Sequence, residues 1–226
     1  MAKTISIAID GPAGAGKSTI ARHLAKDLGY YYVDTGAIYR TVAYFFDLWG
    51  VSPKDADAVR RYIDELTVGI EYDGEGVQHM IMNGMDVTGD IRTQDIAQKA
   101  SLVSAYPEVR EMLLDMQRDI ARRHNVIMDG RDIGTVVLPK ATVKIFLTAS
   151  PEVRANRRTQ ELKAKGQKAN YEQILKEIQQ RDYQDTHRDI APLKMAKDSV
   201  KVDTSDLDID GVVAAIKEII AKKVAQ

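Results

Sequence analysis

Short apolar segments alternate with longer amphipathic segments along most of this chain. Short apolar runs bounded by turn residues are typical of buried strands, whereas apolar residues spaced three or four apart are typical of helices. The expected strands span residues 4–9, 30–33, 126–128, 143–147 and 200–202, and the expected helices span residues 18–28, 37–48, 53–66, 91–104, 107–123, 151–165, 171–188 and 209–224. Strands that alternate with helices predict an α/β fold of three layers, with helices on both faces of a mostly parallel, five-stranded sheet.

The pattern changes between residues 67 and 90. Residues 68–72 and 77–82 are expected to form strands, and turn residues occupy 73–76 and 83–84. Two strands joined by so short a connection are typical of a hairpin. This region is therefore expected to be a small antiparallel insertion.

A glycine-rich segment joins the first expected strand to the first expected helix. It consists of Gly11, Pro12, Ala13, Gly14, Ala15, Gly16, Lys17 and Ser18, followed by Thr19, and it matches the pattern G-x-x-x-x-G-K-[ST]. The alternative is a glycine-rich turn with a surface lysine, but the strand and helix stand in the order that a phosphate-binding loop requires. In such a loop the backbone N–H groups approach phosphate oxygens, Lys17 reaches the β- and γ-phosphates, and the Ser18 hydroxyl binds Mg²⁺ directly.

Composition mainly excludes other classes of function. The chain has 32 Lys and Arg, 33 Asp and Glu, a formal net charge of −1, and no cysteine. Disulfides, thiolate metal sites and cysteine nucleophiles are therefore excluded, and no global field attracts nucleic acid or an anionic membrane. No signal-like segment precedes the first expected strand, and no apolar run approaches the length of a membrane span. We expect a cytoplasmic protein that binds neither nucleic acid nor membrane.

Polar clusters follow two of the expected strands. Residues 34–36 follow the second strand, and residues 129–132 follow the strand at 126–128. Ligands of such sheets bind outside the carboxyl ends of the strands, so both clusters are expected to face the same crevice as the phosphate-binding loop. Asp129 has the position of the acid that completes a phosphate-loop Mg²⁺ site, directly or through water. The alternative is an ordinary turn aspartate, because Asp-Gly is a frequent turn dipeptide.

Arginines on two expected helices provide a further indication of phosphate chemistry. Arg154, Arg157 and Arg158 share one helix face, and Arg181, Asp185 and Arg188 share another. Guanidinium groups suit phosphate oxygens, and a segment hinged near Gly166 could close over a transferring phosphoryl group. The alternative is a solvated helix surface with ordinary ion pairs, such as Arg157 with Glu161.

Five segments spread over the chain resemble those of bacterial cytidylate kinases, in the nucleoside monophosphate kinase group of P-loop NTPases. They are residues 9–19, 34–40, 89–94, 129–137 and 191–193. The resemblance implies transfer of the γ-phosphoryl group of ATP, with Mg²⁺, to CMP or dCMP. It implies one kinase chain, which we expect to be a monomer, with a core (1–34, 106–152 and 188–226), a monophosphate-binding region (35–105, including the insertion at about 67–90) and a short helical lid (about 153–187).

The resemblance also implies the residues of the acceptor site. The matching positions are Thr35, Arg40, Arg92, Ser101, Arg110, Arg131, Asp132, Arg181, Asp185 and Arg188. Those expected to stabilise the transferring phosphoryl group are Lys17, Arg131, Arg154, Arg158, Arg181 and Arg188. In members of the family, arginines at the Arg40 and Arg131 positions hold the acceptor phosphate, and Asp185 with Arg181 is expected to meet the sugar hydroxyls.

The implied pocket suits cytosine, which has an amino donor at N4 and acceptors at N3 and O2. Asp132 can accept from N4, while Arg110 and Ser101 can donate to N3 or O2. Uracil would present an acceptor to the carboxylate and leave a buried group unpaired. A site built on such hydrogen bonds can reject the wrong partner by roughly 10⁴-fold.

Three other functions share the phosphate-binding loop. A regulatory GTPase needs a guanine-reading N-K-x-D motif, and this sequence has none. A kinase for adenylate, uridylate or shikimate would need an acceptor pocket other than the set of Asp132, Arg110 and Ser101. A nucleotide-binding scaffold without turnover predicts damage at Lys17 or in the arginines, and none is visible.

Overall fold

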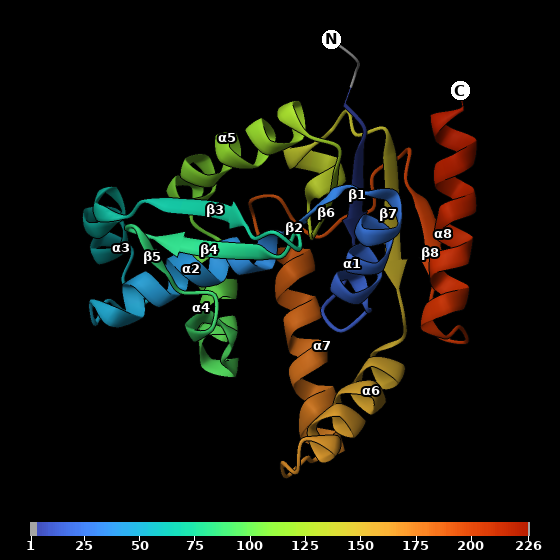
Figure 1. Ribbon diagram of the computed structural model, residues 1–226. Helices are drawn as coiled ribbons and strands as arrows, with labels where there is room; N and C mark the ends of the chain where they lie inside the picture. Colours follow the sequence, from blue (N-terminus) through green and yellow to red (C-terminus); the bar gives the residue numbers. More distant parts are fainter. Residues whose placement is uncertain (1–3, 226) are drawn as a thin grey trace.

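Five parallel strands form the central sheet of the computed structural model, which describes residues 4–225 (Figure 1). Their order is β2-β6-β1-β7-β8, and every neighbouring pair is parallel. The strands are β1 (Ser6–Asp10), β2 (Tyr31–Asp34), β6 (Val126–Gly130), β7 (Val143–Thr148) and β8 (Val200–Asp203). The five-stranded parallel sheet expected from the sequence is confirmed.

Helices cover both faces of this sheet because its strands are apolar on both sides. Ile7 and Ile9 pack in one buried cluster with α1 (Lys17–Leu28) and α8 (Ile209–Val224). Ala8, which points the other way, belongs to a second cluster with α2 (Thr35–Leu48) and α5 (Pro107–Arg123). This alternation along one strand produces the three layers predicted by the sequence.

The insertion is an antiparallel sheet beside the β2 edge of the core (Figure 1). It contains β3 (Val68–Tyr72), β4 (Gln78–Met82) and the short β5 (Met85–Asp86). The sequence predicted the first two strands but not β5, which has only two residues. On the chain the insertion is flanked by α3 (Ala56–Tyr62) and α4 (Gln94–Val103).

Both flanking helices are shorter than expected. The helix predicted at 53–66 begins at Ala56, because the Asp55 side chain caps it by accepting from Ala58 N at 3.0 Å, and it ends in a 3₁₀ turn (Ile63–Glu65). The helix predicted at 91–104 begins at Gln94, because Thr93 Oγ1 accepts from Ile96 N, and a 3₁₀ turn (Asp90–Arg92) precedes it. Side-chain caps set these boundaries.

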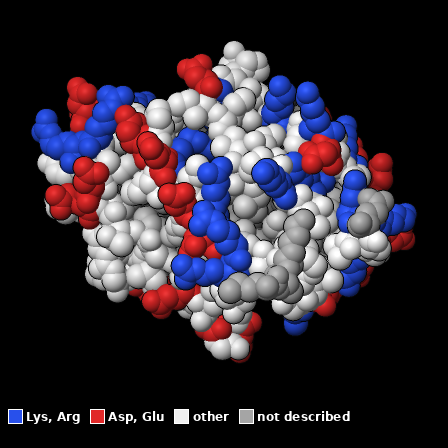
Figure 2. All heavy atoms as spheres, turned by 90° about the horizontal axis from the view of Figure 1, so that it is seen from above, with Lys and Arg blue, Asp and Glu red and all other residues white. Residues whose placement is uncertain are grey.

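Two helices, α6 (Pro151–Ala164) and α7 (Tyr171–His187), pack together and project beyond the carboxyl edge of the parallel sheet (Figure 1). Gly166 turns the chain between them in the left-handed conformation, at φ 70°. Basic and acidic side chains both occur across the face shown in Figure 2, as the near-zero net charge predicts. In the described part of the chain, every helix is too short or too polar to cross a membrane.

Candidate active site

The phosphate-binding loop connects the end of β1 to the start of α1 at the carboxyl edge of the sheet. Gly11 has a φ of 151°, and a Cβ atom there would lie 1.9 Å from the carbonyl oxygen of Leu147, so this position requires glycine. Gly16 precedes α1 at φ 87° and provides no side-chain cap. The first N–H groups of α1 are thus left to an anionic ligand.

Lys17 is the first residue of α1, and its side chain is buried, with 6% exposed. Its Nζ donates to the carbonyl oxygen of Pro12 at 2.8 Å, inside the loop. Burial, followed by the nearby Arg131, lowers the pKa of Lys17 to about 7. A bound triphosphate would favour the charged ammonium again, because opposite charge stabilises it.

Ser18 meets Asp129 beside the loop. The Oγ of Ser18 donates to Oδ2 of Asp129 at 3.0 Å, and the hydroxyl of Tyr32 donates to Oδ1 at 2.8 Å. Burial, with the nearby Asp34, raises the pKa of Asp129 to about 6. Asp129 belongs to β6, so it is a buried strand residue rather than a turn aspartate.

The oxygens of Ser18 and Asp129 suit Mg²⁺, which binds through a few protein oxygens together with water and substrate phosphates. In residues 4–225 no group of three or more His, Cys, Asp or Glu side chains could hold a metal alone. This donor set fits an ion that arrives with a nucleotide.

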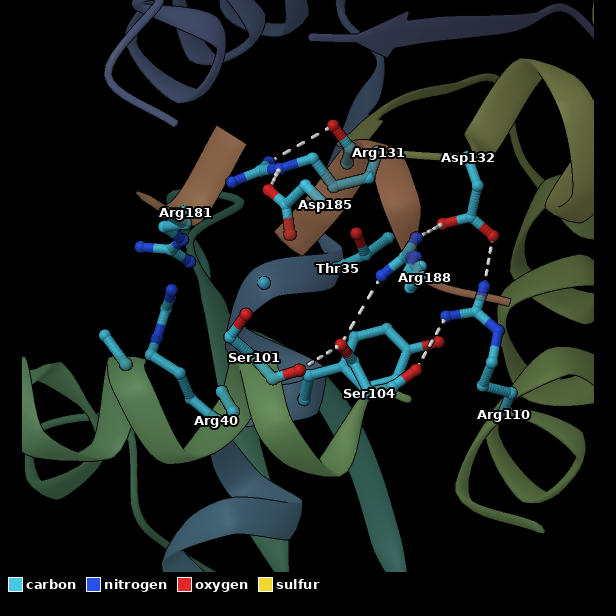
Figure 3. A pocket seen from close by; sticks show the side chains of 15 residues that line it. Thr35, Arg40, Ser101, Ser104, Arg110, Arg131, Asp132, Arg181, Asp185 and Arg188 are labelled. Carbon is cyan, nitrogen blue, oxygen red and sulfur yellow. Dashed lines mark hydrogen bonds and ion pairs between the residues drawn. The ribbon is translucent and has the colours of Figure 1, made fainter. Parts of the chain in front are cut away.

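A second cluster of polar side chains lines a pocket between α2, α4, α5 and α7 (Figure 3). All of the predicted acceptor residues except Arg92 line it: Thr35, Arg40, Ser101, Arg110, Arg131, Asp132, Arg181, Asp185 and Arg188. Arg92 is exposed and instead lines a larger cleft that also reaches Ser18, Arg40 and Arg158. The structure thus brings residues from positions 35 to 188 into one pocket.

One end of this pocket is rich in arginine. Arg131 donates from Nε to Oδ2 of Asp185 at 2.7 Å, and Arg40 donates from Nη2 to Oδ2 of Asp34 at 3.0 Å. The Nε atoms of Arg40 and Arg181 are both buried without a hydrogen-bond partner. Burial, followed by Arg131, lowers the pKa of Arg181 to about 10. Unpaired buried donors and clustered positive charge favour an anion here.

The other end is organised by Asp132, which follows β6 and is 4% exposed. Its Oδ2 is paired with Nη2 of Arg110, while Arg188 approaches Oδ1 at 3.5 Å. Arg110 also donates from Nη1 to the carbonyl of Ser104 at 3.2 Å, and its guanidinium lies 5.6 Å from the ring centre of Tyr39. Burial raises the pKa of Asp132. This end offers a carboxylate oxygen and guanidinium donors close together.

The arginines of α6 have different surroundings. Arg154 is 2% exposed and donates to the carbonyls of Ala13 and Ala149 and to both oxygens of Asp182, so it ties the phosphate-binding loop to α7. Arg157 donates to Thr204. Arg158 pairs with Glu161 at 2.9 Å, so the ion pair considered for Arg157 is formed by its neighbour.

Two polar side chains of the pocket were not predicted from the sequence. Ser104 lines the pocket, and its Oγ accepts from Nη1 of Arg188 at 3.4 Å. Tyr39 lines it beside Arg40, and burial raises the pKa of Tyr39 to about 12. Helical spacing could have indicated both, because Ser104 lies three residues after Ser101 and Tyr39 lies four after Thr35.

A phosphate-binding loop at the carboxyl edge of a parallel sheet, beside an arginine-rich pocket, defines a P-loop kinase. Residues 7–222 match the family model described as cytidylate kinase, and this chain belongs to that family. The cytidylate kinase of Carboxydothermus hydrogenoformans is 50% identical over 96% of this chain and 97% of its own length. That of Ligilactobacillus salivarius is 50% identical over 99% of both chains.

Another relative is the cytidylate kinase of an Exiguobacterium species, which is 48% identical over 97% of this chain and 98% of its own. Among solved structures, a shikimate kinase from Bacteroides thetaiotaomicron covers 96% of this chain and 98% of its own. It is 15% identical, with a TM-score of 0.48. That likeness is too distant to bear on the acceptor.

Proposed function

We propose that this protein transfers the γ-phosphoryl group of ATP to CMP or dCMP, giving ADP and CDP or dCDP. Membership of the cytidylate kinase family supports the reaction. The observation that carries the acceptor site is the pair of buried, unpartnered Nε atoms of Arg40 and Arg181 in one pocket. Leaving a buried donor unpaired costs about 1–3 kcal/mol, and a phosphate group would supply the missing acceptors.

In this proposal the acceptor phosphate lies at the arginine-rich end of the pocket, held by Arg40, Arg131 and Arg181. The ion pair of Arg131 with Asp185 supports this, because it orients the guanidinium before the substrate arrives. The remaining N–H groups of Arg131 can then donate to phosphate oxygens. Asp185, with Arg181, meets the sugar hydroxyls, Thr35 completes the pocket around the monophosphate, and Arg92 contributes from the adjoining cleft.

Cytosine lies at the other end of the pocket. Its N4 amino group donates to Asp132, whose Oδ1 makes, among the residues that the structure describes, a single contact of 3.5 Å with Arg188. Arg110 and Ser101 donate to N3 and O2, and Arg188 closes the pocket over the base. UMP is rejected because its O4 would face the carboxylate and leave buried polar groups unpaired.

ATP binds with its triphosphate in the loop formed by residues 11–19. The unsatisfied N–H groups at the start of α1 and the buried ammonium of Lys17 support this placement. Ser18 would hold Mg²⁺ directly and Asp129 would hold it through water. When bound, the ion neutralises charge on the β- and γ-phosphates.

Phosphoryl transfer needs placement and charge neutralisation more than a nucleophilic side chain. The acceptor is itself a phosphate and is largely deprotonated at neutral pH, so no strong general base is required. Lys17, Arg131, Arg181 and Arg188 stabilise charge on the transferring group, and Arg154 and Arg158 contribute from the lid. We also propose that the protein acts as a monomer. Use of ATP together with a nucleoside monophosphate supports a cytoplasmic location.

A coupled assay of ADP formation tests the proposal. The purified protein is supplied with ATP, Mg²⁺ and one acceptor at a time: CMP, dCMP, UMP, AMP or shikimate. We expect rapid turnover with CMP and dCMP and far slower turnover with the other three. A kcat/KM for UMP, AMP or shikimate equal to or higher than that for CMP would overturn the assignment of the acceptor. The absence of turnover with any acceptor would refute the kinase activity.

A further inference from the structure

In the described part of the chain, β2 is an edge strand of the parallel sheet, and an exposed strand edge leaves backbone groups to be satisfied. Two side chains of the antiparallel insertion supply the partners. The hydroxyl of Tyr72 donates to the carbonyl of Tyr32 at 3.0 Å, and the backbone N–H of Asp34 donates to Oε1 of Gln78 at 2.7 Å. These two side chains therefore bind backbone groups of β2 that a sixth strand would otherwise bind.

Tyr72 and Gln78 form a single contact unit. They are paired directly across β3 and β4, so their side chains leave the insertion together. Gln78 is 8% exposed, and the ring of Tyr72 packs edge-on against Tyr31 with centroids 4.7 Å apart. A buried hydrogen bond between a side chain and the backbone restricts both partners, so this contact fixes the end of β2.

Asp34 connects this contact to the acceptor pocket. While its N–H is held by Gln78, its Oδ1 accepts from Ala37 N at 2.9 Å and so caps α2. Its Oδ2 accepts from Nη2 of Arg40 at 3.0 Å. Arg40 lines both the acceptor pocket and the larger cleft that reaches Ser18. The position of this arginine therefore depends on Asp34.

We infer that Gln78, supported by Tyr72, is a positioning residue for the acceptor phosphate: it fixes Asp34, and Asp34 fixes Arg40. The inference rests on the proposed function and extends it to the antiparallel insertion. Gln78 lines the cleft but not the acceptor pocket, so it acts through Arg40 rather than by contact with the base. The insertion thereby becomes part of the machinery that selects a phosphate acceptor.

The first test is Gln78→Met, which preserves the length and burial of the side chain and removes the acceptor for Asp34 N. We expect the KM for CMP to rise about tenfold, because the variant loses the hydrogen bonds of the Gln78 amide to the N–H and carbonyl of Asp34, and the KM for ATP to stay within about twofold. The matched control is Gln117→Met. Gln117 is 1% exposed on α5 and donates only to Leu113 of its own helix, so both KM values should stay unchanged.

A double-mutant cycle with Arg40→Ala separates positioning from general destabilisation. If Gln78 acts through Arg40, adding Gln78→Met to Arg40→Ala should change the KM for CMP by less than about twofold. Independent, multiplicative effects would overturn the inference. Tyr72→Phe removes only a hydroxyl and should raise the KM for CMP about threefold, again without effect in the Arg40→Ala background. If Gln78→Met does not fold, the Tyr72→Phe variant tests the inference by itself.

Failure of this inference is distinguishable from failure of the proposed function. A wild-type protein that does not phosphorylate CMP refutes the function. A wild-type protein that does so, alongside Gln78→Met and Tyr72→Phe variants with unchanged KM for CMP, refutes only the role of Gln78.

Discussion

Arg131 and Asp185 meet in the acceptor pocket, where Nε of the arginine lies 2.7 Å from Oδ2 of the aspartate although 54 positions separate them. The contact joins the segment after β6 to α7. Burial alone would raise the pKa of Asp185, but Arg131 outweighs it together with other arginines and lowers that pKa. The pocket is therefore organised by ion pairs, and the predictions below test which charges perform which task.

Lys17→Ala should reduce kcat by roughly 10²–10³-fold, because it removes a positive charge aimed at the transferring phosphoryl group. The fold should persist, since within residues 4–225 the variant loses a single side-chain hydrogen bond, to the Pro12 carbonyl. Steady-state assays and circular dichroism check both points. Lys222→Ala, at the exposed end of α8, is the control. Near-normal turnover by Lys17→Ala would contradict the mechanism.

Asp132→Ala should raise the KM for CMP by at least about a hundredfold while the KM for ATP changes little, because the N4 amino group loses its acceptor. The variant also leaves Arg110 without its buried partner, so thermal stability should fall. Asp132→Asn preserves the shape of the side chain, so comparison with Asp132→Ala separates the effect on CMP binding from the effect on stability. Discrimination between CMP and UMP should decrease in both variants. Equal changes in the KM values of CMP and ATP would refute the role of Asp132.

Arg188→Ala should lower kcat or raise the KM for CMP by about tenfold, because Arg188 approaches Asp132 and Ser104 at the base end of the pocket. Initial rates measured against CMP at saturating ATP test this. Arg122→Ala, on the exposed end of α5, is the comparison. A silent Arg188→Ala variant would exclude a role for Arg188 in binding CMP or in the transfer.

Arg154 and Arg158 should behave differently although they lie on the same helix. Arg154→Ala should lower the midpoint of thermal unfolding by several degrees, because it breaks a buried ion pair with Asp182 and two bonds to carbonyls. Arg158→Ala should leave stability nearly unchanged, since its pair with Glu161 is exposed, and should lower kcat. Calorimetry and kinetics on both variants test this separation. An unchanged melting temperature for Arg154→Ala would contradict it.

Asp10 provides a prediction about pH. It accepts from the N–H groups of Ile133 and Gly134, both at 2.7 Å, and burial raises its pKa from 3.8 to about 6. The folded protein therefore binds this proton at a higher pH than the unfolded chain does. Above about pH 6 the buried negative charge lowers the stability of the folded state, and protonation relieves this cost as the pH falls toward 4.

On going from pH 7.5 to pH 5, the free energy of unfolding of the wild type should accordingly rise by about 1 kcal/mol relative to that of Asp10→Asn. Denaturant unfolding of both proteins at several pH values measures this difference. A difference that does not change with pH would show that Asp10 titrates at its ordinary pKa.

Much of the fold was predictable because it depends on local patterns. The apolar runs and helical spacings located the strands of the parallel sheet and the hairpin of the insertion. The caps at Asp55 and Thr93 shifted two helix boundaries, and β5 was too short to have a pattern of its own. Motif residues placed the phosphate-binding loop correctly because a glycine loop between strand and helix is itself a local structure.

The acceptor pocket was only partly predictable, because helical spacing identifies residues that share a face but not what that face meets. Arg154 and Arg158 were predicted together, yet one is buried against Asp182 and the other is paired at the surface. Ser104 and Tyr39 enter the pocket through the packing of α2 against α4.

By itself, the sequence determined the order of elements, the phosphate-binding loop and the family, because each is written in short stretches of neighbouring residues. Only the tertiary structure decided that Ser18 meets Asp129, that Asp10 holds the N–H groups of Ile133 and Gly134, and that Gln78 holds Asp34. Those contacts follow from the strand order β2-β6-β1 and from the docking of the insertion on the free edge of β2. They depend on packing between segments distant in the chain, which no local pattern records.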